Sequence, residues 1–168
     1  ALNNYSAILV GRGTGSNIWH WCTRDNPQLA QSFQEIMTNF FALRELYIWN
    51  DNQTGRLAPV STNLIDLQAA DNRYASADLS GKDQLVYCNF SGNRLTNLVR
   101  TGCTSLRMLD VHGNRLGTAQ LDELLAFLDT SAPHLESAQL DFNAARPSAE
   151  GYAHYSNIFD RMDGRIYV

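Results

Sequence analysis

The sequence has 168 residues, of which 44% are hydrophobic and 18% charged, and its formal net charge is −4. That length suits one domain, because a domain usually holds roughly 100–200 residues. No run of about eighteen apolar residues occurs, so no membrane-spanning helix is predicted. The lack of a basic excess also argues against a nucleic-acid-binding protein. Two residue types are abundant, with 21 leucines and 15 asparagines.

Residues 1–42 are predicted to form an N-terminal cap that consists of a β-hairpin and a helix. An apolar strand over 5–10 and a second strand over 17–23 are separated by a glycine-rich turn over 11–16. The helix is predicted over 25–40, because Asp-Asn-Pro at its start is a helix-capping sequence and apolar residues follow at helical spacing.

Two tryptophans, Trp19 and Trp21, lie in the second strand of this cap. Because strand side chains alternate between the two faces, both rings are predicted to lie on the same side. They then either cover the open end of the core beneath the first repeat or form an outward apolar patch on which a partner docks.

The pattern L-x-x-L-x-L-x-x-N recurs through the rest of the chain, residues 43–168. Copies start near residues 43, 64, 85, 106 and 135, so the first three steps are each 21 residues long. Alternating apolar residues at the fourth and sixth positions predict a short strand that is buried on one face. The asparagine at the ninth position predicts a turn whose side-chain amide bonds neighbouring repeats as a ladder. Such repeats bury their apolar faces only against each other, which predicts an elongated domain.

The step to the last copy is longer, and its extra residues have the spacing of a helix that begins near Thr118. The buried face of this helix is predicted from Leu121, Leu124, Leu125 and Leu128. Pro147-Ser148 predicts the start of another helix that ends near Met162, and residues 165–168 then predict a last parallel strand.

The five copies of the template resemble the leucine-rich repeat family, and the resemblance covers residues 43–168. The segment that begins LDVHGNRLGTAQLDELLAFLD is similar to the C-terminal repeats of bacterial and phage members. The resemblance implies an α/β fold: a right-handed leucine-rich-repeat solenoid with a parallel sheet on its concave face and helical C-terminal repeats. It also implies a module for recognition or assembly without enzymatic activity.

From this resemblance we expect a structural component of a phage virion, either a capsid decoration protein or a tail-associated attachment protein. Its partner would be a capsid or tail protein, and so short an array would bind best in several copies on a symmetric scaffold. The alternative is a protein on the bacterial surface, or secreted, that binds a host protein or a glycan. No cofactor, metal ion, nucleic acid or membrane insertion is expected.

The N-terminus shows no basic-then-apolar signal peptide. Ala1 is typical of a trimmed initiator methionine, so the sequence favours cytosolic synthesis, while a cleaved leader stays open as an alternative. The three cysteines are odd in number and have no C-x-x-C spacing. They predict buried, reduced thiols rather than a disulfide framework or a zinc site.

Parallel strands place equivalent template positions in columns about 4.8 Å apart on the exposed face of the sheet. These columns are polar and mildly acidic, and they carry few aromatic residues. Mixtures of aromatic and polar residues suit contacts with protein or sugar, and the alternative is a solvated face without a ligand. The candidate binding residues are Tyr47, Trp49, Gln68, Tyr87, Asn89, Asp110, His112 and Asp141.

Ser91, His112 and Asp141 occupy one column in the order that a catalytic triad needs, so a hydrolase is a weaker alternative. The sequence around Ser91 lacks a strained nucleophile elbow, and an open sheet offers no oxyanion hole. Asp110, His112 and Asp141 could also hold a divalent ion, but three ligands on one flat sheet leave poor geometry. We therefore expect neither catalysis nor a metal site.

An arginine follows the template asparagine in three repeats, and these residues are called the arginine rim: Arg73, Arg94 and Arg115. One hypothesis is that the rim binds an anionic partner, because arginine makes bidentate contacts with anions. The other is local pairing with acids such as Asp51 and Asp71, which is preferred because exposed charges are usually solvated.

Overall fold

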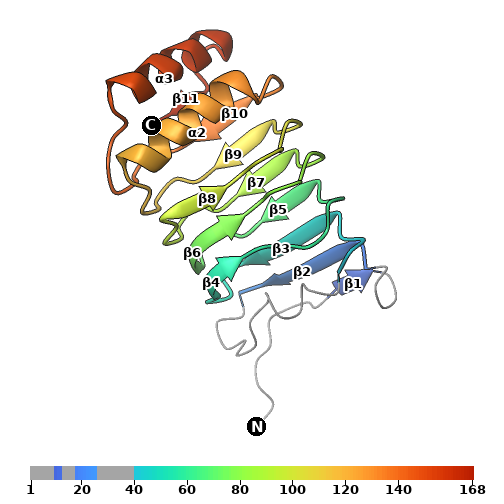
Figure 1. Cartoon of the computed structure of the whole chain (residues 1–168). Helices are drawn as coiled ribbons and strands as arrows, with labels where there is room; N and C mark the ends of the chain where they lie inside the picture. The colour runs from blue at the N-terminus through green and yellow to red at the C-terminus, as the bar shows by residue number, and fades with distance from the viewer. Residues whose placement is uncertain (1–9, 13–17, 26–39) are drawn as a thin grey trace.

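The computed structural model describes residues 10–12, 18–25 and 40–168 as a β-solenoid with two parallel-strand layers and two helices (Figure 1). The main sheet contains β1 (Val10–Arg12), β2 (His20–Arg24), β3 (Glu45–Trp49), β5 (Asp66–Gln68), β7 (Tyr87–Asn89), β9 (Met108–Asp110), β10 (Ser137–Gln139) and β11 (Ile166–Tyr167). The second sheet contains β4 (Thr54–Leu57), β6 (Arg73–Asp78) and β8 (Asn97–Val99). The helices are α2 (Thr118–Thr130) and α3 (Ala149–Arg161).

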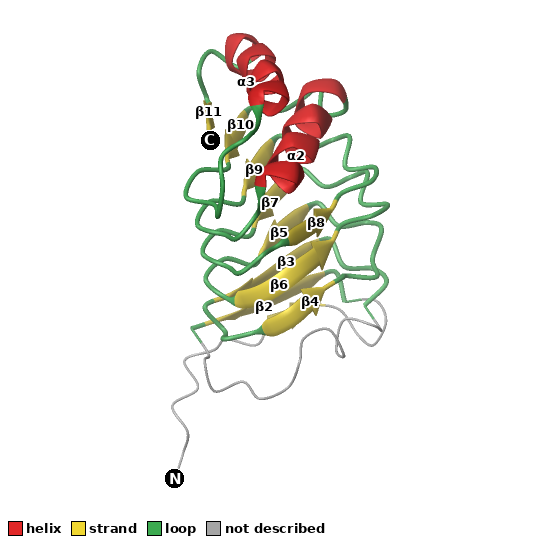
Figure 2. Ribbon diagram, turned by 60° about the vertical axis from the view of Figure 1, so that its left-hand side comes forward, coloured by secondary structure: helices red, strands yellow, loops and turns green. Residues whose placement is uncertain are grey.

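The predicted parallel strands are confirmed in all five copies of the template. Glu45 pairs with Asp66, Asp66 with Tyr87, and Tyr87 with Met108, so each turn of the chain advances the register by one repeat. Met108 pairs in turn with Ser137, although the chain between them is longer by the length of α2. The main sheet therefore continues unbroken while the other side of the solenoid changes from strand to helix (Figure 2).

The core is the interior between the main sheet and the opposite layer, and the template positions fill it. The first, fourth and sixth positions are buried in every copy: Leu43, Leu46, Ile48, Leu64, Leu67, Ala69, Leu85, Cys88, Phe90, Leu106, Leu109, Val111, Leu135, Ala138 and Leu140. Each large member contributes about 1.5–3 kcal/mol by leaving water. Apolar burial is thus spread along the solenoid axis, turn by turn.

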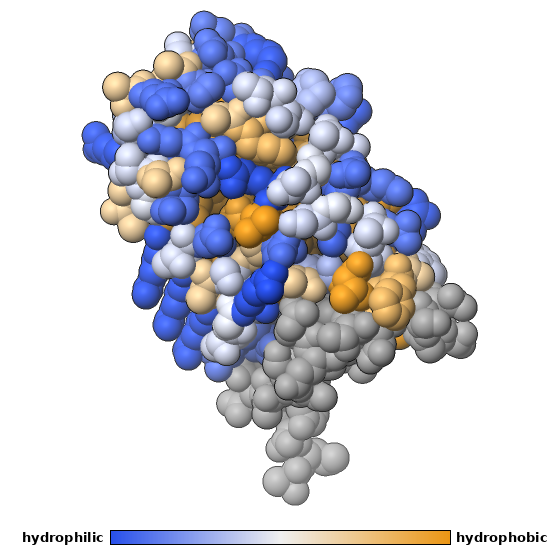
Figure 3. Space-filling view, viewed as in Figure 1, coloured by the Kyte–Doolittle hydropathy of each residue, from blue (hydrophilic) through white to orange (hydrophobic). Residues whose placement is uncertain are grey.

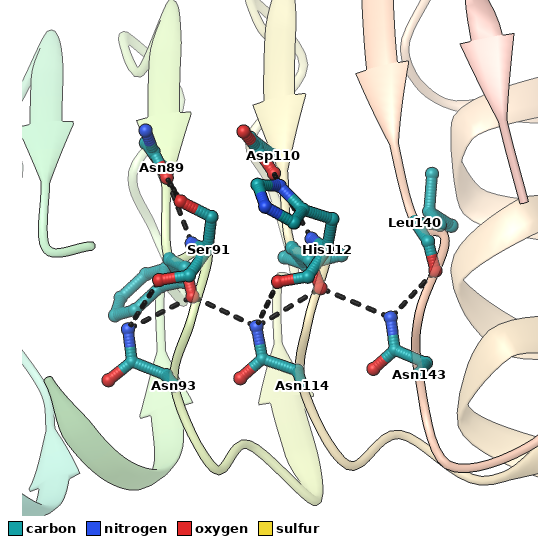
Figure 4. A network of polar contacts seen from close by, with 10 residues as sticks. Asn89, Ser91, Asn93, Asp110, His112, Asn114, Leu140 and Asn143 are labelled. Atoms are coloured by element: carbon teal, nitrogen blue, oxygen red, sulfur yellow. Dashed lines mark hydrogen bonds and ion pairs between the residues drawn. The ribbon is translucent and has the colours of Figure 1, made fainter. Parts of the chain in front are cut away.

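The asparagine ladder is confirmed, and it connects each turn to the one before it (Figure 4). Asn93 Nδ2 donates to the carbonyl of Ala69 at 2.9 Å and to that of Phe90 at 3.0 Å, while its Oδ1 accepts from the Tyr74 N–H at 3.0 Å. Asn72, Asn114 and Asn143 make the equivalent bonds in their own turns. Buried backbone groups that no strand pairs are satisfied in this way.

The predicted N-terminal hairpin is confirmed, because β1 pairs antiparallel with β2, but the strand bounds differ from the prediction. The described strand is Val10–Arg12, so Gly11 and Arg12, which were predicted to lie in the turn, belong to the strand. Residues 1–9, 13–17 and 26–39, which include the predicted helix, lie outside the described residues.

The second strand of the hairpin also belongs to the solenoid. β2 pairs parallel with β3, with Trp21 opposite Leu46, so it adds a further turn before the first template copy. Trp21 is buried against Phe40, with ring centroids 5.0 Å apart, whereas Trp19 is 39% exposed. The prediction that both tryptophans lie on one side is therefore wrong. Trp19 precedes the strand, and its carbonyl accepts from the N–H groups of Arg44 and Glu45.

The three-stranded second sheet was not expected from the sequence. In β6, Tyr74 and Ala77 are buried while Arg73 and Ala75 are exposed, so burial does not follow the simple alternation of a strand. The register between β4 and β6 also shifts between Gly55 and Arg56. Stacking on the neighbouring turn, rather than a local pattern, makes these segments strands.

The C-terminal helices and last strand are confirmed. The four predicted leucines are the buried residues of α2, Ser148 caps α3 by accepting from the Gly151 N–H, and β11 pairs parallel with β10. Neither helix in the described part of the chain is long and apolar enough to cross a membrane. Cys88 and Cys103 are free thiols, and both are buried. Burial raises the pKa of Cys103 to about 11, which keeps the thiol protonated.

Helix α3 is fastened to α2 around Asp129. The carboxylate of Asp129 accepts from Asn157 at 2.9 Å and bonds His154 Nδ1 at 2.8 Å, and Arg161 donates to the Asp129 carbonyl at 2.8 Å. Burial alone would raise the pKa of Asp129, but these hydrogen bonds and the nearby charges outweigh it, so the pKa is lowered. The charged form of Asp129 therefore stabilises the docked helix.

We expect Asp129→Asn to lower the free energy of unfolding by about 1 kcal/mol at neutral pH, because the hydrogen bonds lose their charge. The pKa of Asp129 in the folded state lies below its ordinary value of 3.8. The stabilisation by the ionised carboxylate is therefore present above pH 3.8 and is lost as the pH falls through the folded-state pKa. Urea unfolding of both proteins between pH 7 and pH 3 measures it. The two stabilities should converge in acid, and a constant difference would contradict the role of the carboxylate.

Candidate recognition face

The face of the main sheet that points away from the core is called the polar face. It consists of the third, fifth and seventh template positions, which alternate with the buried positions along each strand. The structure brings all eight predicted binding residues together on this face, each half-buried or exposed. Because the backbone beneath them is paired on both sides, their spacing is fixed by the sheet.

An aromatic cluster occupies the N-terminal end of the polar face. The Tyr47 ring centroid lies 5.3 Å from that of His20 and 5.8 Å from that of Trp49. Tyr47 donates its hydroxyl hydrogen to Asp66 Oδ2 at 2.9 Å, and His20 Nδ1 lies 2.6 Å from Glu45 Oε2. Burial, followed by the hydrogen bond to Asp66 and the acids nearby, raises the pKa of Tyr47, so the phenol stays neutral. These contacts hold the rings in defined orientations.

A groove of about 420 Å³ lies beside this cluster. Ala70 leaves it open, because a small side chain stands between the larger residues of the neighbouring columns. Gln68 Nε2 donates to Asp66 Oδ1 at 2.7 Å, so one acid orients both a tyrosine and an amide. The groove is lined by Tyr47, Trp49, Asp66, Gln68, Ala70 and Asn89.

Exposed apolar side chains occupy the centre and the edge of the polar face. Tyr87 is 40% exposed and pairs with Met108, which is 46% exposed, and both line a groove of about 140 Å³. Phe142, at the strand exit, is 81% exposed and has φ of 56°, a conformation that costs a bulky residue energy. The binding residues predicted from the sequence did not include His20, Asp66, Met108 and Phe142. Cross-strand neighbours of Tyr47 and Tyr87 could have indicated the first three.

The three residues of the suggested triad lie in neighbouring turns, but their side chains are not linked as a triad. Figure 4 shows the contacts of Ser91 and His112. Ser91 donates its hydroxyl hydrogen to Asn89 Oδ1 at 2.8 Å, and His112 Nδ1 lies 2.7 Å from Asp110 Oδ1. Ser91 and His112 thus each pair with the residue two positions earlier in the chain. Within the described ranges, no hydrogen bond joins Ser91 to His112 or His112 to Asp141.

The arginine rim lies at the exit of the main sheet, and its three side chains are exposed. The backbone N–H groups of Arg73, Arg94 and Arg115 donate to the preceding turn at 2.7–3.1 Å, which fixes their spacing. Asp51, one of the acids expected to pair with them, is buried and accepts a hydrogen bond from Thr23. Among the residues described, none of the three guanidinium groups forms an ion pair.

In the part of the chain that the structure describes, no three histidine, cysteine or acidic side chains converge in a way that could hold a metal ion. The polar face is a surface of oriented aromatic, amide and carboxylate groups. Comparison of the chain with models of known protein families and with curated protein sequences finds no match.

Proposed function

We propose that the chain is a right-handed leucine-rich repeat solenoid that serves as a recognition and assembly module without enzymatic activity. It binds a protein partner through its polar face. The observation that carries this proposal is the row of oriented aromatic and polar side chains on a continuous parallel sheet. Such a face is preorganised, so binding costs little side-chain entropy. Tyrosine and tryptophan are also the residues that most often dominate binding energy at protein interfaces.

We expect Trp49→Ala and Tyr47→Ala each to weaken partner binding by about thirtyfold, because interface tryptophans and tyrosines often contribute roughly 2 kcal/mol or more. Calorimetric titration with the protein that copurifies with the chain measures this loss of affinity. Tyr152→Ala is the control, since Tyr152 is an exposed aromatic residue that lies on α3 and not on the polar face. Equal losses for all three variants would contradict a site on the polar face.

The virion location stays a prediction, with a capsid or tail protein as the expected partner. A small face that binds weakly gains apparent affinity when many copies occupy a symmetric scaffold. Immunogold electron microscopy of the source particles should then place the protein on capsids or tails at regular intervals. A monomer that is absent from every particle would favour a bacterial surface or secreted protein instead.

Glycan binding is a second candidate, and the groove beside Tyr47 and Trp49 favours it. Aromatic rings stack on the apolar faces of sugars, while the Asp66 carboxylate and the amides of Gln68 and Asn89 can bond hydroxyl groups. A glycan array read with the wild type and with Trp49→Ala tests this candidate. Binding of one sugar class that disappears in the variant would support it, and an unchanged array signal would oppose it.

A serine hydrolase is not proposed, because Ser91 donates to Asn89 rather than to a histidine. Nucleophilic catalysis by serine needs a base within hydrogen-bonding reach of the hydroxyl group. Mass spectrometry after treatment with a serine-directed phosphonate should find Ser91 unmodified. A phosphonylated Ser91 would return the hydrolase to consideration.

A further inference from the structure

The second sheet ends at β8, and this creates an open strand edge on the side opposite the polar face. β6 pairs with β8 on one side, but the next turn contributes α2 in place of a strand. Neighbouring strands lie about 4.8 Å apart, whereas a helix with its side chains is about 10–12 Å wide. The main sheet keeps its spacing through β9 and β10, so the layers diverge between β8 and α2 (Figure 2).

A groove of about 540 Å³ occupies this divergence. Val99 and Arg100 line its strand side, while Glu123 and Phe127 line its helix side. Figure 3 shows apolar side chains at the surface near β8 and α2, amid mostly hydrophilic residues. The groove is separate from the polar face, because it shares no lining residue with the two grooves there.

The strand edge that faces the groove carries backbone groups oriented for pairing. The carbonyls of Val99 and Thr101 accept from Leu79 and Gly81, toward β6. Since alternate residues of a parallel strand bond to opposite sides, the backbone groups of Leu98 and Arg100 point toward the groove. A strand that adds to this edge would lie as far from β8 as β6 does on the other side.

Arg100 supplies an incompletely satisfied cation at the same place. Its Nη1 donates to the Leu98 carbonyl at 2.9 Å, and the guanidinium carbon lies 5.5 Å from the centre of the Phe127 ring. Its Nε is buried without a hydrogen-bond partner among the described residues. Burial lowers the pKa of Arg100, and Glu123 acts in the opposite direction without forming an ion pair among those residues. A buried donor on a cation favours an anionic acceptor.

We propose that this groove binds an extended peptide segment with an acidic side chain, which pairs with the outer edge of β8. A peptide N–H replaces Arg100 Nη1 on the Leu98 carbonyl, and the peptide carboxylate binds the guanidinium group that is released. The pairing covers only Leu98 to Arg100, so main-chain bonds give orientation and the carboxylate gives selectivity. Phe127 forms the apolar wall against which a neighbouring side chain of the peptide packs.

The test selects binders from an mRNA-displayed library of random ten-residue peptides, using the full chain as target. The enriched peptides should share an acidic residue. Glu→Gln in the peptide and Arg100→Gln in the protein should each weaken binding about tenfold or more, and the two changes together should cost no more than either one alone. N-methylation of a peptide amide should abolish binding where that amide pairs with β8, and it should be tolerated at the alternate positions. Arg44→Gln removes an exposed arginine that lies outside both the groove and the arginine rim, and it should leave peptide binding unchanged.

Three results would overturn the proposal. In the first, no peptide is enriched on the wild type over a selection on Arg100→Gln. In the second, the peptides still bind when any of their amides is methylated. In the third, the peptides no longer bind Trp49→Ala but still bind Arg100→Gln. The last result would place the peptides on the polar face. Because Arg100→Gln could disturb folding, Glu123→Gln is measured as well. It removes a competing carboxylate from the groove and should tighten binding of the same peptides, and an unchanged or weaker affinity would count against the proposal.

Discussion

Asn93→Ala is expected to lower the free energy of unfolding by about 2–4 kcal/mol. The side chain of Asn93 is nearly buried and bonds backbone groups of two successive turns. Its removal leaves the Tyr74 N–H, which lies inside the core, without an acceptor, and a buried unpaired donor costs about 1–3 kcal/mol. The lost bonds to the Ala69 and Phe90 carbonyls add to that cost. Urea unfolding followed by circular dichroism measures the change.

The matched control is Asn97→Ala, because Asn97 is an exposed asparagine four residues away. Its stability should stay within about 0.5 kcal/mol of the wild type, as for most surface substitutions. If Asn93→Ala were as mild as the control, the ladder would be an incidental contact rather than the link between turns.

Phe90→Ala is expected to be at least as severe, with a loss of about 3–5 kcal/mol. Phe90 is fully buried, and its ring meets that of Tyr74 edge-on, with centroids 6.4 Å apart. It fills the sixth template position, where the copy before it has only Ala69, so neighbouring turns cannot close the resulting cavity. The same unfolding measurement gives the loss, and hydrogen exchange locates it.

Phe90→Leu keeps an apolar side chain at the same site and should recover most of the stability. In hydrogen exchange of Phe90→Ala, amides of β7 and its neighbours β5 and β9 should exchange fastest, because a solenoid turn is stabilised only by adjacent turns. Uniform acceleration along the chain would instead indicate a core that unfolds as one unit.

The template predicted the main sheet because it specifies local and repeated features. Leu85, Cys88 and Phe90 recur at the spacing of Leu64, Leu67 and Ala69, and this spacing fixes strand, buried face and register together. The earlier turn at β2 was missed because Thr23, a polar residue, stands where the template has an apolar one. That threonine is buried and donates to Asp51, so a polar pair takes the place of a packed side chain.

The polar face was predicted as a set of residues but not as a set of contacts. Column positions follow from the repeat, whereas the partner of each side chain depends on rotamers that the spacing does not determine. Ser91 therefore bonds Asn89, and His112 bonds Asp110, rather than each other. The groove at β8 was unpredictable for another reason. It arises where strand and helix meet on the second layer, and no pattern in the sequence predicts strands there.

We propose that the polar face is the surface that binds a partner. Photocrosslinking in the source cells tests it most directly, with p-benzoylphenylalanine placed at Tyr87 in one variant and at Tyr152 in another. The two tyrosines are equally exposed, at 40%, but lie on β7 and α3. We expect one crosslinked partner from position 87 and none from position 152. Crosslinks from position 152 alone, or equal crosslinks from both, would contradict it.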